Sequence, residues 1–280
     1  MSYKLPILTT PSGFAVHPFK KLKGNLLRSL FLTVLRSYAL TVFLMFITGF
    51  CLAQEGVVTY SISHNWVNKF ASCEFIPKAD RERYLYTWGG QKEYVENAEL
   101  KFNATANRYE ITGDQSTSIY KGREEAYIIY RDREKNETFD VMTFLTKECV
   151  IQDSIPCQNW KIKNDMREIA GHICMNATFR DTIKGKDVIA WFALDLPVPI
   201  GPDKYCGLPG MILEISEANG ALVYTATSVL LSNEKLEIPK PVVKKKIKTI
   251  NYEEYNKKLM EYIAECKKLQ RPYFWGGVSF

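Results

Sequence analysis

Residues able to carry out chemistry are few in this chain. Only two histidines, His64 and His172, follow residue 53, and the sequence lacks the nucleophile-elbow, zinc-histidine and phosphate-loop motifs. His172 and Cys174 lie two residues apart, which places two metal-ligand types on one face of a strand. Two ligands do not complete a metal site, so we expect both to have structural roles. The sequence predicts no catalytic, cofactor-binding or metal-binding residue and favours a protein that is not an enzyme.

The cysteines are the next candidates. Six follow residue 53: Cys73, Cys149, Cys157, Cys174, Cys206 and Cys266. An even number of cysteines in an exported chain favours disulfides. The sequence after residue 53 contains no Cys-x-x-Cys pair, so it does not support a zinc knuckle or a thioredoxin-type redox site. We expect at least two disulfides, with Cys149–Cys157 first, because residues 153–156 are predicted to form a turn between antiparallel strands. The alternative is that some are buried thiols, which pack as small hydrophobic side chains.

The first 53 residues have the pattern of a secretory signal peptide. They contain six basic and no acidic residues, and 37–53 form an uncharged apolar run that ends at Ala53. We expect cleavage after Ala53, although an uncleaved anchor and a lipid-modified Cys51 are alternatives; the long basic region also leaves the true start codon open. Since the run is shorter than the roughly 20 residues needed to cross a bilayer, cleavage is favoured over an anchor. No transmembrane span is expected after cleavage. The rest has 31 basic and 31 acidic residues, which disfavours a nucleic-acid partner.

Short alternating segments separated by turn residues dominate the remainder and predict an antiparallel meander. The predicted strands are 56–63, 98–103, 108–112, 126–131, 138–150, 160–163, 173–179, 187–194, 211–216 and 222–231. Apolar residues at helical spacing predict an amphipathic helix over 251–270. The predicted fold is therefore mainly β, a curved antiparallel sheet or half-barrel with a C-terminal helix. The domains expected are a leader (1–53), a β domain (54–250), and a helix and tail (251–280) packed on it.

Two turns are specified locally. Asn219-Gly220 predicts a type I′ hairpin turn, which sets Ile215 opposite Tyr224 and places the apolar residues of both strands on one face. Residues 196–210, called the proline loop below, contain four prolines and three glycines, so we expect a stiff loop between strands. Within it, 208–211 predicts a type II turn with Gly210 at a positive φ.

At these residues the chain resembles the GLPGLI family of exported Bacteroidota proteins. The signature is Gly-Leu-Pro-Gly-Met-Ile-Leu at 207–213, preceded by matching segments around Trp160, 169–177, Ala190-Trp191 and 197–202. The resemblance implies an exported, largely β protein, often encoded beside outer-membrane TonB-dependent receptors, and assigns no catalytic residue. The signature residues form a candidate contact surface: Trp191, Pro197, Gly201, Pro202, Tyr205, Gly207, Leu208, Pro209 and Gly210.

The function that the sequence favours is a non-enzymatic envelope module in the periplasm or at the outer-membrane or cell surface. Its partner would be an envelope protein such as a TonB-dependent receptor, or an apolar ligand. An envelope enzyme and a purely structural module are the alternatives. Polar groups clustered in one pocket would favour an enzyme, and a dry apolar cavity would favour binding. An exposed apolar patch would argue against a structural module.

Overall fold

The computed structural model describes residues 55–87, 93–114, 127–145, 147–243 and 246–275. All of them belong to one compact unit, Ala53–Phe280. The predicted leader and its cleavage site lie outside the described residues. Within these ranges, no helix has the length and apolar character needed to cross a membrane.

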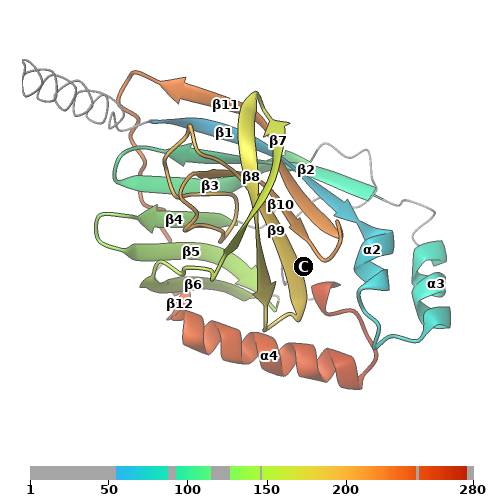
Figure 1. The fold of residues 1–280 in the computed structure, drawn as a ribbon. Helices are drawn as coiled ribbons and strands as arrows, with labels where there is room; N and C mark the ends of the chain where they lie inside the picture. The colour runs from blue at the N-terminus through green and yellow to red at the C-terminus, as the bar shows by residue number, and fades with distance from the viewer. Residues whose placement is uncertain (1–54, 88–92, 115–126, 146, 244–245, 276–280) are drawn as a thin grey trace, which may run out of the picture. The chain divides into compact units, whose positions relative to one another are not determined.

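In the described part of the chain, twelve strands form one open sheet (Figure 1). Their order is β12-β6-β5-β4-β3-β2-β1-β11-β10-β9-β8-β7. The strands are β1 Glu55–Asn65, β2 Glu93–Phe102, β3 Ala106–Asp114, β4 Ile128–Asp132, β5 Glu137–Phe144, β6 Lys147–Ser154, β7 Lys161–Ile169, β8 His172–Asp181, β9 Lys186–Ala193, β10 Met211–Glu217, β11 Leu222–Ser232 and β12 Lys248–Ile250. Only β12, which runs parallel to β6, departs from antiparallel pairing among these strands. The predicted mainly β fold is confirmed.

The C-terminal helix is also confirmed, as α4 (Tyr252–Lys268). Its N-cap is Asn251, whose side chain accepts a hydrogen bond from the Glu254 backbone N–H at 2.8 Å. The helix buries Leu259, Ile263 and Cys266 and lies beside the β6 and β12 edge of the sheet (Figure 1). Its amphipathic pattern therefore identifies the face that packs.

Four elements depart from the sequence-based prediction. Helices α2 (Trp66–Ala71) and α3 (Lys78–Thr87) were not predicted, because α2 is too short to show a period and α3 buries no residue. The short strand β12 was also missed. Residues 138–150, predicted as one strand, divide between β5 and β6 around Leu145, which adopts a positive φ of 49°. The polar run that follows, 146–148, contains no Gly, Pro, Asn or Asp, so a pattern-based prediction misses that turn.

The β10–β11 hairpin follows the predicted register. Ile215 lies opposite Tyr224, and Asn219 and Gly220 have the positive φ values of a type I′ turn, but Ala218 before them has a positive φ as well. Apolar residues on the predicted inner face are buried: Met211, Leu213, Ile215, Leu222, Tyr224 and Ala226. Glu217 continues the same face and is only 1% exposed. The hairpin thus carries a carboxylate into the interior.

The predicted type II turn at 208–211 is wrong in its central feature. Gly210 is not among the glycines with positive φ, whereas Gly207 is, at +88°. Gly210 is required for another reason, because a Cβ there would lie 2.0 Å from the Ala193 carbonyl oxygen. The proline loop approaches β9 so closely at this point that only glycine fits.

The proline loop is buried against the sheet and held by polar contacts from several strands. Arg131 of β4 donates to the Lys204 carbonyl at 2.9 Å. The Tyr127 hydroxyl donates to Asp203 at 2.5 Å, and Tyr205 donates to Glu217 at 2.8 Å. Because these partners come from distant parts of the chain, the loop is an interior element of the fold.

Candidate functional site: a lysine-lined pocket

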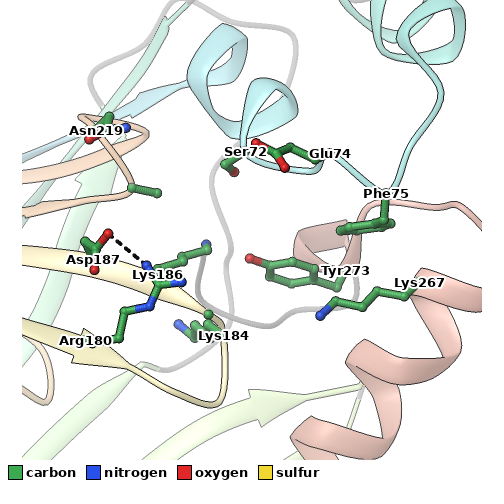
Figure 2. Close-up of a pocket in the computed structure, with 12 residues that line it drawn as sticks. Ser72, Glu74, Phe75, Arg180, Lys184, Lys186, Asp187, Asn219, Lys267 and Tyr273 are labelled. Atoms are coloured by element: carbon green, nitrogen blue, oxygen red, sulfur yellow. Dashed lines mark ion pairs between the residues drawn. The ribbon is translucent and has the colours of Figure 1, made fainter.

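A pocket of about 630 Å³ lies where four separate parts of the chain meet (Figure 2). They are the β8–β9 turn, the segment after α2, the β10–β11 turn, and the end of α4 with the 3-10 helix η1 (Tyr273–Trp275). The lining residues are Ser72, Glu74, Phe75, Arg180, Lys184, Gly185, Lys186, Asp187, Ala218, Asn219, Lys267 and Tyr273. Four of these side chains are cationic and two are carboxylates.

The β8–β9 turn supplies two of the lysines. The Asp181 side chain accepts hydrogen bonds from the backbone N–H groups of Ile183 and Lys184, which closes the turn. Gly185 provides the positive φ, +70°, that the reversal needs. This geometry directs Lys184 and Lys186 inwards, where they are 7% and 6% exposed.

Burial lowers the pKa values of these two lysines. Desolvation, assisted by the positive charge of Lys204, lowers the pKa of Lys184 to about 8. Desolvation together with Lys184 also holds the pKa of Lys186 well below its usual value. The Glu217 carboxylate opposes both shifts. Such perturbed side chains beside a cavity are typical of functional sites.

The opposite wall comes from the C-terminal part of the chain. Figure 2 shows the Tyr273 hydroxyl and the Lys267 ammonium directed towards the lysines of the β8–β9 turn. The Lys186 ammonium lies 5.0 Å from the centre of the Tyr273 ring, a cation–π contact. Burial raises the pKa of the Tyr273 hydroxyl, which therefore stays a neutral hydrogen-bond donor.

The lining carries more positive than negative charge. Asp187 pairs with Arg180 at 2.8 Å, and this pair is exposed. The remaining ionisable groups of the lining are the Glu74 carboxylate and three lysines, Lys184, Lys186 and Lys267. The arrangement can hold an anionic group by charge and by N–H and O–H donors.

Three polar side chains, Lys69, His64 and Glu96, are joined by hydrogen bonds close to Lys186 of the pocket. The Lys69 ammonium is 2.8 Å from His64 Nδ1, and His64 Nε2 is 2.9 Å from Glu96. An ammonium can only donate, so Nδ1 accepts and Nε2–H donates to the carboxylate, which defines a neutral imidazole. Lys69 is 3% exposed and adds to the positive potential at Lys186.

The sequence analysis missed this pocket. Lys184 and Lys186 flank a glycine in a turn, and lysines in turns are usually solvated. Lys267 and Tyr273 lie about 80 residues further along the chain. The only local signal was the Lys-Gly-Lys turn between two predicted strands, and it does not distinguish a buried wall from a solvated one.

The residues of the predicted contact surface are mostly covered. Tyr205 is fully buried, so it is not an exposed aromatic anchor. Gly201, Pro202, Leu208 and Gly210 are buried as well. Pro197, Gly207 and Pro209 are exposed, and Trp191 is half-buried beneath the Arg167 guanidinium, 4.1 Å from its ring centre. A contact role for the exposed part of the proline loop stays a prediction.

The six cysteines are free thiols in the structure, five of them buried and Cys157 exposed. The strand arrangement expected for Cys149–Cys157 is wrong, because β6 and β7 lie near opposite ends of the sheet and do not pair. His172 binds Asp195 at 2.7 Å. Within the described ranges no cluster of three or more His, Cys, Asp or Glu side chains could hold a metal ion.

Comparisons with known proteins find one family model and two solved structures, and none of them gives the chain an activity. Residues 179–214 match a family model described as a protein of unknown function (Porph_ging). The match includes β9, the proline loop and the Lys-Gly-Lys turn. No curated protein matches the chain.

Two solved structures of PNGF-II, in space groups C2 and P21, are similar to the chain at 18% and 16% identity. Their TM-scores are 0.42 and 0.46, and each alignment covers 75% of this chain and 33% of the PNGF-II chain. The chain thus spans a third of the length of those structures, and so distant a similarity indicates nothing about its activity.

Proposed function

We propose that the chain is an exported cell-envelope protein of the GLPGLI type and acts as a non-enzymatic binding module. Its lysine-lined pocket holds the anionic group of the ligand or of the protein partner. The observation that carries this proposal is the excess of cationic side chains, two of them nearly fully buried, around a cavity of about 630 Å³. A hollow lined mainly by one sign of charge concentrates ions of the opposite sign, so the convergence of these lysines favours an anionic occupant.

The character of the pocket also bears on the alternatives. An apolar ligand does not suit a lining of lysines and carboxylates, so such a ligand would need another surface. A partner such as an outer-membrane TonB-dependent receptor would engage the pocket through acidic side chains. A purely structural module offers no reason to place lysines around a cavity.

An envelope enzyme is the second candidate, and one observation favours it. A lysine with a pKa of about 8, such as Lys184, has a reactive neutral amine near physiological pH and could form an imine with a carbonyl substrate. Borohydride reduction in the presence of a carbonyl compound would then leave a covalent adduct on Lys184, whereas a binding module would show none.

The anionic ligand can be tested by reversing one charge at the pocket rim. We expect inorganic phosphate or succinate, at constant ionic strength, to raise the melting temperature of the wild type by about 2–4 °C more than that of Lys267→Glu. Lys268→Glu is the matched control, because Lys268 is exposed on the same last turn of α4 and does not line the pocket. General stabilisation by these anions is shared by all three proteins.

The same measurement has a pH dependence of known sign. Lys184 is protonated below pH 8 and loses its charge above it, so the anion-dependent shift should be larger at pH 7 than at pH 9. Equal shifts in wild type, Lys267→Glu and Lys268→Glu, with no effect of pH, would contradict an anion-binding pocket.

Export is tested separately. Because the uncharged run ends at Ala53, mass spectrometry of protein purified from cell envelopes should find a mature N-terminus at Gln54. A retained leader or a lipid on Cys51 would contradict cleavage after Ala53 and leave the pocket proposal unaffected.

A further inference from the structure

The connector between β6 and β7, residues 155–160, forms hydrogen bonds with Cys206 of the proline loop. The Cys206 backbone N–H donates to the Gln158 side chain at 3.0 Å, and the Trp160 indole donates to the Cys206 carbonyl at 2.9 Å. Gln158 also donates to the Lys204 carbonyl at 3.1 Å. Cys206 and Lys204 are therefore held against this connector.

Cys157 lies within the same set of contacts. The Cys206 sulfur is 3.0 Å from the carbonyl oxygen of Pro156, the residue directly before Cys157. In a trans peptide that oxygen is about 2.8 Å from the next Cα, so the Cys206 sulfur lies within about 6 Å of the Cys157 Cα. This upper limit is compatible with a disulfide, and the Cys157 and Cys206 thiols already interact electrostatically. A rotation about the Cys157 Cα–Cβ bond moves its sulfur without displacing the backbone.

We propose that Cys157 and Cys206 form a disulfide that fastens the proline loop to the β6–β7 connector. Cys157 is exposed and Cys206 is buried, so an external oxidant reaches Cys157 first. With a small-molecule disulfide as oxidant, the Cys157 thiolate attacks one of its sulfurs and releases one thiol. The Cys206 thiolate then attacks the Cys157 sulfur and releases the second thiol. Two protein thiols are oxidised to one disulfide, and their two electrons and two protons pass to the oxidant, which is reduced to two thiols.

The bond would enclose β7, β8 and β9 in a covalent loop. Closing a long loop restricts the unfolded chain, so the oxidised protein should melt several degrees higher than the reduced one. Burial raises the pKa of the Cys206 thiol, so the second step should be slow at neutral pH and faster as the pH rises. We expect this rise in melting temperature to require both Cys157 and Cys206 and to persist when Cys149 is replaced.

The test starts from the purified, fully reduced protein incubated with glutathione disulfide, alkylated and digested with trypsin. Trypsin leaves Cys149 and Cys157 on one peptide, 148–161, and Cys206 on another, 205–235. We expect these peptides to be cross-linked, with the loss of two hydrogens, in wild type and in Cys149→Ser but not in Cys157→Ser. Since Cys157 is exposed, the Cys157→Ser protein should fold and show no rise in melting temperature on oxidation.

Two outcomes would overturn the proposal. One is a cross-link between the same peptides that persists in Cys157→Ser and disappears in Cys149→Ser, since it would place the bond at Cys149. The other is glutathione retained on Cys157 while Cys206 is alkylated, because it would show that the second sulfur is out of reach.

Discussion

Gly210→Ala should destabilise the protein by about 3 kcal/mol or more, which is large for the addition of one methyl group. An alanine Cβ would lie 2.0 Å from the Ala193 oxygen and 2.8 Å from its carbonyl carbon. Both neighbours are backbone atoms within the sheet, so neither can rotate away. Relief requires a shift of β9 against the start of β10, where Met211 lies opposite Ala193.

Gly207→Ala is the control that separates this clash from backbone strain. Gly207 has φ +88°, and no atom lies within 4 Å of the position that a methyl group would occupy there. Alanine at this position therefore meets only the conformational penalty of about 1–2 kcal/mol. Urea unfolding of both variants gives the comparison. A Gly210→Ala loss equal to or smaller than that of Gly207→Ala would show that the loop can move away from β9.

The sheet could be predicted from sequence where its determinants are local. The Asn219-Gly220 turn specifies its own φ values, and these set the β10–β11 register by themselves. Alternation of apolar and polar residues likewise marks most strands, and helical spacing marks α4. Each of these signals acts over fewer than about 20 residues, within which neighbouring side chains determine the outcome.

Features that depend on distant pairing could not be predicted. Glycine is required at position 210 because the backbone of β9 lies too close for a Cβ, whereas the neighbouring Pro209 suggested that Gly210 serves a turn. The pocket brings Lys184 and Tyr273 together, and no sequence pattern near either residue predicts that they lie side by side. A lysine is solvated by default, so its burial is set by tertiary packing alone.

Asp140 is the residue for which we expect the second large effect. It is fully buried on β5, and its carboxylate accepts hydrogen bonds from Thr138 at 2.6 Å and from Tyr252 of α4 at 2.5 Å. The buried Arg131 lies diagonally across the β4–β5 pair and interacts with it electrostatically. The carboxylate thus connects the sheet, α4 and the arginine that holds the proline loop.

Asp140→Ala should therefore cost about 3–5 kcal/mol at neutral pH, because it removes the carboxylate that interacts electrostatically with the buried guanidinium and that accepts hydrogen bonds from two hydroxyl groups. Tyr252→Phe is the matched variant, since it removes only one of these hydrogen bonds and should cost about 1 kcal/mol. In the double variant, Tyr252→Phe should add almost nothing to the loss, because its hydroxyl has no acceptor once Asp140 is gone. Additive losses in urea unfolding would show that the two side chains stabilise the fold independently.

The pH dependence gives an independent check on the same carboxylate. Burial raises the pKa of Asp140 from 3.8 to about 6, although Arg131 and both hydroxyl donors oppose the shift. A group with a raised pKa in the folded state contributes stability that is complete below pH 3.8 and is lost as the pH rises through 6. The stability difference between wild type and Asp140→Asn, which cannot titrate, should therefore shift in favour of the asparagine variant between pH 4 and pH 6. A difference that stays constant over this range would mean that Asp140 is charged throughout, with Arg131 outweighing the effect of burial.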